Sequence, residues 1–125
     1  MRTARIKTFK DLLVWQKAMQ LCIEVYRVTR TFRPDEKHGL TAEARKTARS
    51  IPYNIAEGYK RGSTVEYIRF LGIAGGSISE LETQLLLADS LGYDKDRAML
   101  PVLALRAEVE RMLDSLVRAL KAKIK

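Results

Sequence analysis

Residues 63–88 of the chain read STVEYIRFLGIAGGSISELETQLLLA, and the spacing of their apolar side chains decides the fold. These side chains recur in alternating steps of four and three residues, the seam pattern of a helix in a left-handed bundle. The members of this stripe are Tyr67, Leu71, Ala74, Ile78, Leu81, Leu85 and Ala88. Ser63 and Glu66 have the spacing of a capping box, so we expect this helix to span residues 64–91.

Three further segments show helical periodicity, near residues 12–32, 40–60 and 95–122. Four amphipathic helices with short connections predict an all-α, up-and-down antiparallel four-helix bundle. With 125 residues, the chain is long enough for one core and one domain. We therefore expect residues 1–125 to form a single domain with a basic N-terminal arm and a basic C-terminal tail.

The expected helix starts are marked by side chains that accept hydrogen bonds from the first turn. Asp11 is the expected N-cap of the first helix, Thr41 of the second, and Asp94 or Asp96 of the fourth. The expected inner stripe of the first helix is Trp15, Ala18, Cys22, Val25, Thr29 and Phe32. That of the fourth is Val102, Leu105, Val109, Met112, Leu116 and Leu120, widened by Leu103, Leu113 and Val117.

The second helix contains a proline and several polar residues. Pro52 removes a backbone donor at a cost of about 3 kcal/mol, so either the helix kinks or two short helices meet, and the unbroken apolar phase favours a kink. Ser50, Asn54 and Glu57 are interpreted as a structural polar clasp that fixes the hairpin, with Glu57 also at ion-pair spacing from Arg61. The alternative is a binding or catalytic carboxylate at Glu57, which lacks a partner acid or metal-ligand set.

The net charge of +8 is unevenly distributed along the chain. Residues 1–65 contain fourteen Lys and Arg against six Asp and Glu, residues 66–114 five against nine, and residues 115–125 four against none. This asymmetry favours a polyanionic partner such as nucleic acid, although it can also determine how identical subunits meet. The expected phosphate-binding residues are Arg45, Lys46, Arg49, Lys60 and Arg61.

A second stripe of the third helix is small rather than large, with Gly72, Gly75 or Gly76, and Ser79. Each interior glycine costs about 0.8–1 kcal/mol relative to alanine, so we expect compensation by close packing of another helix, from this subunit or a neighbouring one. The alternative, a phosphate-binding glycine loop, lacks the P-loop lysine and the preceding strand. Together with the broad apolar stripe of the fourth helix, this stripe is the basis for expecting a homo-oligomer.

Other function classes find little support in the residues. Cys22 is the only cysteine and is interpreted as a buried, inert thiol, and the only histidine, His38, as a loop residue. Paired carboxylates, an activated nucleophile and metal-ligand spacings are lacking, so we expect no enzymatic activity, no cofactor and no metal. The apolar runs are too short to span a membrane and residues 1–11 do not resemble a secretory signal, so a cytoplasmic location is expected.

Several strings together resemble a known family. They are residues 9–18, 38–40, 50–58, 73–77, 80–82 and 91–93, and the string Asn54-Ile-Ala-Glu-Gly58 is the most specific. Over residues 9–120 the chain resembles the bacterial four-helix bundle proteins encoded in intervening sequences of large-subunit ribosomal RNA genes. It departs from them at Glu43, where many relatives have glutamine, and at Thr47, in a stretch usually richer in arginine.

The resemblance implies an up-and-down bundle that assembles into a ring of five subunits and has no established enzymatic activity. More remotely, it implies kinship with the basic accessory protein of diversity-generating retroelements, a ring that works with a reverse transcriptase and nucleic acid. Two functions are therefore expected. The first is a non-enzymatic oligomeric protein that binds nucleic acid, RNA rather than DNA. The second is a protein-interaction scaffold or accessory subunit for a larger enzyme such as a reverse transcriptase.

Overall fold

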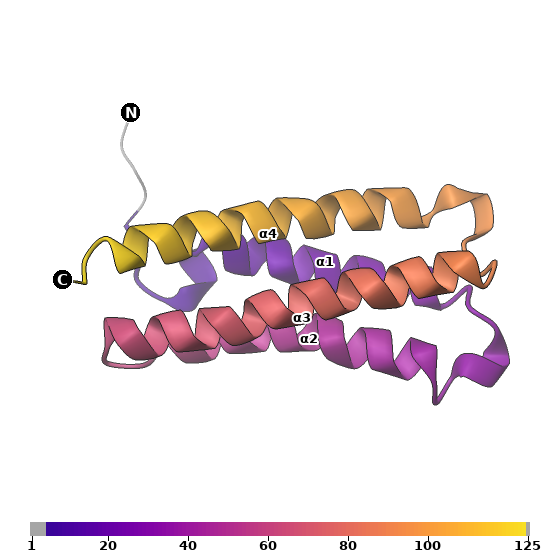
Figure 1. Cartoon of the computed structure of the whole chain (residues 1–125), viewed down its shortest axis with the longest axis horizontal. Helices are drawn as coiled ribbons and strands as arrows, with labels where there is room; N and C mark the ends of the chain where they lie inside the picture. The colour runs from indigo at the N-terminus through magenta and orange to yellow at the C-terminus, as the bar shows by residue number, and fades with distance from the viewer. Residues whose placement is uncertain (1–4, 125) are drawn as a thin grey trace.

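The computed structural model describes residues 5–124, which form four long helices joined by short connections (Figure 1). Each helix packs on its two neighbours in chain order, with α4 returning to α1, so the predicted all-α, up-and-down antiparallel four-helix bundle is confirmed. Arg2, in the expected basic arm, and Lys125 lie outside the described residues. The long helices are α1 (Leu13–Thr29), α2 (Leu40–Tyr59), α3 (Thr64–Ser90) and α4 (Met99–Lys121), and the single 3-10 turns are η1 (Phe9–Asp11), η2 (Pro34–Glu36) and η3 (Lys95–Arg97).

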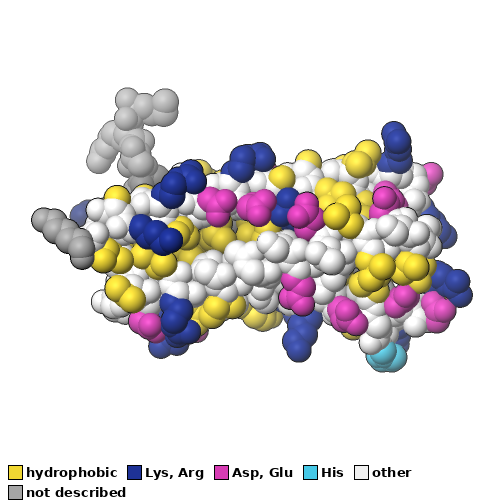
Figure 2. All heavy atoms as spheres, viewed as in Figure 1, with side chains coloured by type: hydrophobic (Ala, Val, Ile, Leu, Met, Phe, Trp, Pro, Cys, Tyr) yellow, Lys and Arg dark blue, Asp and Glu magenta, His cyan; other side chains and the backbone are white. Residues whose placement is uncertain are grey.

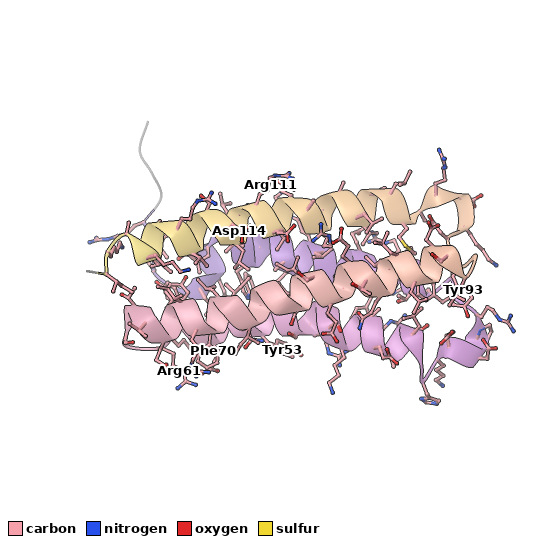
Figure 3. The ribbon with its side chains drawn as sticks, viewed as in Figure 1. Tyr53, Arg61, Phe70, Tyr93, Arg111 and Asp114 are labelled. Carbon is pink, nitrogen blue, oxygen red and sulfur yellow. The ribbon has the colours of Figure 1, made fainter. Side chains whose placement is uncertain are left out.

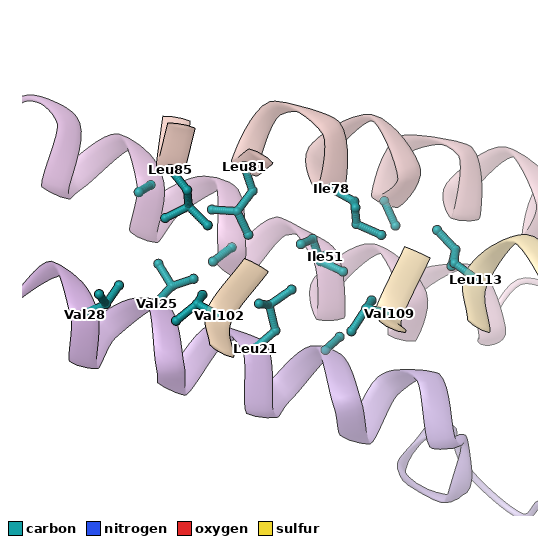
Figure 4. Close-up of a cluster of buried hydrophobic side chains, with 14 of the residues drawn as sticks. Leu21, Val25, Val28, Ile51, Ile78, Leu81, Leu85, Val102, Val109 and Leu113 are labelled. Atoms are coloured by element: carbon teal, nitrogen blue, oxygen red, sulfur yellow. The ribbon is translucent and has the colours of Figure 1, made fainter. Parts of the chain in front are cut away.

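The apolar stripe predicted for α3 forms its buried face. Six of the seven side chains are fully buried and Tyr67 is half-buried, and Leu81 and Leu85 meet Leu21 and Val25 of α1 in the core (Figure 4). Only half of the expected capping box forms. The Ser63 hydroxyl accepts the Glu66 N–H at 3.0 Å, but the Glu66 carboxylate binds Arg69 at 3.1 Å instead of returning to the cap.

The inner stripe predicted for the first helix is confirmed at four of its six residues: Ala18, Val25, Thr29 and Phe32 are buried. Trp15 and Cys22 only flank the core, and Val14, Leu21 and Val28 are buried instead. The helix ends at Thr29 rather than near residue 32, because the following N–H groups bond to carbonyls three residues earlier and tighten the chain into a turn.

Two of the predicted helix caps are also wrong. Asp11 accepts the backbone N–H groups of Lys7 and Thr8 at 2.9 and 3.1 Å, so it closes η1 rather than capping α1. Thr41 is buried inside α2. The first N–H of α2, that of Leu40, is bound instead by the Glu36 carboxylate at 2.9 Å.

The start of α4 differs from the prediction by four residues. Asp96 and Arg97 both have φ of 56°, a left-handed conformation that an α-helix cannot contain, so the helix begins at Met99. Of the two aspartates considered, Asp94 supplies the cap, since its carboxylate accepts the Met99 N–H at 3.0 Å. The buried stripe of α4 is Met99, Val102, Arg106, Val109, Leu113 and Leu120, while Leu105, Met112 and Leu116 lie partly exposed beside it.

Glycines control how closely α3 can be approached. α2 continues through Pro52 as one helix, so the alternative of two short helices is excluded. α2 also packs closely against α3 at Gly58. A Cβ at Gly58 would lie 2.8 Å from Phe70 Cβ. Gly72 and Gly76 have the opposite environment: among the described residues, nothing lies within 4 Å of the position of a Cβ. Gly75 does have a partner, since its Cβ would lie 3.7 Å from Leu113 Cδ2 of α4, so the expected packing is present at Gly75 and missing, among the described residues, at Gly72 and Gly76.

Candidate nucleic-acid interface

The five cations predicted to bind phosphates lie on or just after α2, but they face different surroundings. Arg45 and Arg49 are half-buried against α1, whereas Lys46, Lys60 and Arg61 are exposed. At 100° per residue, Lys46, Arg49 and Lys60 share the outer face of the helix, opposite its buried side. The five residues therefore form one open row with two flanking members rather than a single cluster.

Arg45 and Arg49 connect α2 to Tyr26 of α1. The Arg45 guanidinium lies 4.7 Å from the centre of the Tyr26 ring, and it donates to the Thr29 hydroxyl at 2.9 Å and to the Tyr26 carbonyl at 3.3 Å. Arg49 donates to the Tyr26 hydroxyl at 2.7 Å, a bond that raises the pKa of its guanidinium above the usual value. Each guanidinium has five N–H donors, so both keep donors for a ligand while being held in place.

Lys46 and Lys60 make no salt bridge with any carboxylate in the described chain. Lys46 stands at the rim of a groove of about 470 Å³ between α2 and α3, with Glu43 and Glu80 also in its lining. Lys60 lies at the other end of α2, with its ammonium 5.5 Å from the centre of the Phe9 ring. Both ammonium groups are available for an anionic ligand.

Arg61 is already paired. It forms the expected ion pair with Glu57 at 3.0 Å, and its guanidinium lies 4.8 Å from the centre of the Phe70 ring on α3. A phosphate would therefore have to compete with the Glu57 carboxylate for this side chain. Arg61 is the weakest of the five predicted contacts.

The residues predicted as a polar clasp separate into two groups. Asn54 donates to the Ser50 carbonyl at 2.8 Å, and the Ser50 hydroxyl hydrogen bonds to that of Ser77 on α3. Glu57 lies apart from them and pairs with Arg61 on the surface. The sequence reasoning missed Ser77, although it precedes Ile78 of the buried stripe and could have been recognised as a buried polar residue.

Acidic and basic side chains occur together on the face that α3 and α4 form (Figure 2). The face on which α3 and α4 lie side by side shows a row of Asp and Glu along α4 and a band of backbone and small polar side chains along α3 (Figure 2). On this face Arg106 is buried and contacts Glu82 and Glu110, both at 3.3 Å.

Comparison with known proteins identifies the family of this chain. The family model for the 23S rRNA-intervening sequence protein matches residues 10–115. The chain belongs to this family. Members of the 23S rRNA-intervening sequence protein family are thus expected to share its four helices, and the match includes α2 and all but the last turns of α4.

A solved structure supports the same fold. It is a protein of unknown function from the S23 ribosomal protein family of Bacteroides thetaiotaomicron, 19% identical, with a TM-score of 0.77 over 84% of this chain and 98% of that one. No match was found among curated proteins.

Two further findings concern metal binding and membrane insertion. Within residues 5–124, no group of three or more His, Cys, Asp or Glu could hold a metal ion. No helix in the described part of the chain is both long and apolar enough to cross a membrane.

The sequence reasoning also missed an aromatic side chain on the outer face of α2. Tyr53 is 65% exposed and comes one turn after Arg49. Its helical position relative to the cations could have revealed it, because residues four apart share a helix face.

Proposed function

We propose that this protein is a non-enzymatic homo-oligomer that binds nucleic acid, with RNA as the favoured ligand, through the outer face of α2. The supporting observation is that Lys46, Arg49 and Lys60 project from this face with no carboxylate partner in the described chain. A charged surface of this kind attracts a polyanion by releasing its counterions. The reference to 23S rRNA in the family description is the reason for preferring RNA, in the cytoplasm.

The contacts to α1 favour phosphate binding by the arginines. Holding a long side chain in place costs side-chain entropy, about 2 kcal/mol for a free Arg. Because Tyr26 already restrains Arg45 and Arg49, part of that entropy has been lost before a ligand arrives. The lysines supply mobile point charges, so the surface should bind phosphates with little preference for sequence.

Self-association is the second part of the proposal, with a ring of five subunits as the expected assembly. The support comes from the open stripe of α3, where Gly72, Gly76 and the exposed Ser79 leave the backbone accessible to another helix. A ring requires two different faces to meet, and this stripe is proposed as one of them. Repetition of a modest basic row around a ring would multiply its affinity for one RNA.

A salt titration of RNA binding tests the first part. Binding should weaken as salt rises from about 50 to 200 mM, with a slope that reports the number of phosphates neutralised. The variant Lys46→Glu/Lys60→Glu should reduce that slope by about 0.7 for each phosphate of a single strand that is no longer neutralised. The matched control, Lys95→Glu/Arg111→Glu, changes the net charge equally on the α4 side and should bind nearly as the parent does.

An affinity that does not respond to salt would refute the proposal, and so would an equal loss in both double variants. Charge reversal at Arg45 is a poorer test because it would also break the contacts to Tyr26 and Thr29. The lysine pair is a cleaner test, since neither side chain has a salt bridge or hydrogen bond in the described chain and the one contact that reversal would remove is that of Lys60 with the Phe9 ring.

A scaffold function is the second candidate. Four leucines near the end of the bundle where α3 meets η3 and α4 are about half exposed, and they could dock a larger protein such as a reverse transcriptase: Leu86, Leu87, Leu91 and Leu100. Coexpression with such an enzyme should yield a complex that Leu87→Glu/Leu91→Glu disrupts while RNA binding persists. Failure of both the parent and the variant to retain the enzyme would exclude this function.

A further inference from the structure

The ring of Tyr53 is the one aromatic side chain in the described chain that is exposed rather than half-buried or buried. We propose that it is a stacking platform for an unpaired base, so that the outer face of α2 selects single-stranded over double-stranded nucleic acid. This inference rests on the proposed function and names the class of ligand that the same face would take.

The position of Tyr53 among the cations is the first reason. It follows Arg49 by four residues and Lys46 by seven, and it precedes Lys60 by seven, so all four share one helix face. At a rise of 1.5 Å per residue, the row from Lys46 to Lys60 is about 21 Å long, with the ring at its middle. A strand laid along α2 would therefore meet positive charge on both sides of the ring.

The second reason is that the Tyr53 ring has no pairing partner in the described part of the chain. The other rings near this surface are occupied by neighbours: Tyr26 by Arg45 and Arg49, and Tyr59 by Tyr67 at 6.0 Å between centres. Tyr53 makes no aromatic pair, cation contact or hydrogen bond in the described part of the chain. A tyrosine that is 65% exposed and unpaired can receive a ligand ring without any rearrangement.

A neighbouring contact extends the same edge of the molecule. Tyr53, Phe70 and Arg61 lie along one side, below α3 in the view of Figure 3. The Phe70 ring is covered by two guanidinium groups, with Arg61 at 4.8 Å and Arg69 at 4.5 Å from its centre. Guanidinium planes can themselves stack on bases, so the strand could continue past Tyr53 onto this cluster.

The chemistry of the ring explains the selectivity. A base can stack on tyrosine only when it is removed from its own helix, because in a duplex both of its faces are covered by neighbouring bases. Every base has such a face, so the contact is tolerant of sequence. The lysines and arginines, in contrast, bind phosphates of either form.

The test compares an unstructured RNA with a blunt-ended RNA duplex that has the same number of phosphates. Tyr53→Ala should weaken binding to the unstructured RNA by about 5- to 150-fold, the usual effect of losing one stacked base, and leave duplex binding unchanged. Tyr53→Phe keeps the ring and should bind as the parent does. Leu13→Ala, an apolar side chain on α1 with the same exposed fraction of 65%, is the control for a general loss of apolar surface.

Each outcome distinguishes this inference from the proposed function. If the parent binds neither RNA in a salt-dependent way, the proposed function fails and the inference with it. If the parent binds both RNAs and Tyr53→Ala weakens neither, or weakens both equally, the inference alone is overturned. A change in the mass of Tyr53→Ala by light scattering would also overturn it, because the ring would then be part of a subunit contact.

Discussion

Replacing Gly72 and Gly76 by alanine should stabilise an isolated subunit while weakening its self-association. Both glycines lie inside α3 on its open stripe, where nothing in the described chain lies within 4 Å of the position of a new Cβ. A methyl group there meets no obstacle among residues 5–124. Between subunits it would fill the space that lets a neighbouring helix approach the backbone.

The magnitude follows from helix propensity. Glycine in a helix interior costs about 0.8–1.0 kcal/mol relative to alanine, so the two substitutions should add about 1.6–2 kcal/mol to the free energy of unfolding. For a chain of this length, that corresponds to a rise in Tm of roughly 5–10 °C. Gly58→Ala is the matched control. Its Cβ would lie 2.8 Å from Phe70 Cβ, and overpacking of this kind costs about 1–3 kcal/mol.

Two measurements on the same samples decide the outcome. Urea unfolding at low protein concentration reports the stability of the subunit, and light scattering at micromolar concentration reports its mass. A double variant that is less stable than the parent as a monomer would show that the stripe is not open. A variant that gains stability but keeps the parent's mass would show that self-association uses another face.

Three further predictions concern single interactions. Hydrogen bonds from the Leu40 N–H and the Tyr93 hydroxyl lower the pKa of Glu36 from 4.5. This carboxyl therefore contributes stability that is present above pH 4.5 and is lost as the pH falls through the lowered pKa of the folded state. Glu36→Gln should reduce this loss of stability at acid pH, as measured by urea unfolding. Burial raises the pKa of Tyr67 from 10.0 to about 12, so stability should fall between those values as pH rises, and Tyr67→Phe should remove that fall. Replacing Glu82 and Glu110 by glutamine should lower the free energy of unfolding by about 1–2 kcal/mol, because the buried Arg106 would lose two carboxylates that are themselves nearly half exposed and therefore screened by water.

The sequence predicts the fold well where one stripe is clearly more apolar than its neighbours. α3 is such a case, because small or polar residues flank the stripe, and its buried residues agree with the prediction. In α1, apolar residues occupy two adjacent stripes. Periodicity alone cannot decide whether Val14 and Leu21 or Trp15 and Cys22 face the core, since that choice depends on the helices that pack against them.

Local signals were weakest at the helix starts. Thr41 and Asp11 have the right chemistry for an N-cap, but Glu36 from the preceding turn and the geometry of η1 supply the hydrogen bonds instead. A cap can come from any nearby acceptor, so its identity depends on how the connecting turn folds. Asp96 illustrates the same limit, because its left-handed conformation follows from the turn and not from its residue type alone.

The candidate site shows why charge in a sequence does not by itself identify a binding surface. The contacts of the five predicted cations differ: Arg61 pairs with Glu57, as its spacing in the sequence predicts, whereas Arg45 is held against Tyr26 of another helix. Glu57 lies one turn before Arg61 along the chain, so that pair can be predicted from the sequence. Tyr26 lies on another helix, so its contact with Arg45 can be predicted only when the fold is known. The prediction of phosphate contacts therefore remains strongest at Lys46 and Lys60.

The residues of α2 that contribute to the core and those proposed to bind RNA lie on opposite sides of the helix. Its inner side carries Ala44, Ala48 and Gly58, which allow close packing on neighbouring helices, whereas Lys46 and Tyr53 on the outer side make no contact on which the core depends. Substitutions on the outer side should therefore change ligand binding without changing the free energy of unfolding. If Lys46 or Tyr53 variants lost stability as well, the outer face of α2 would have to be packed against something, and a subunit contact would replace RNA as its most direct explanation.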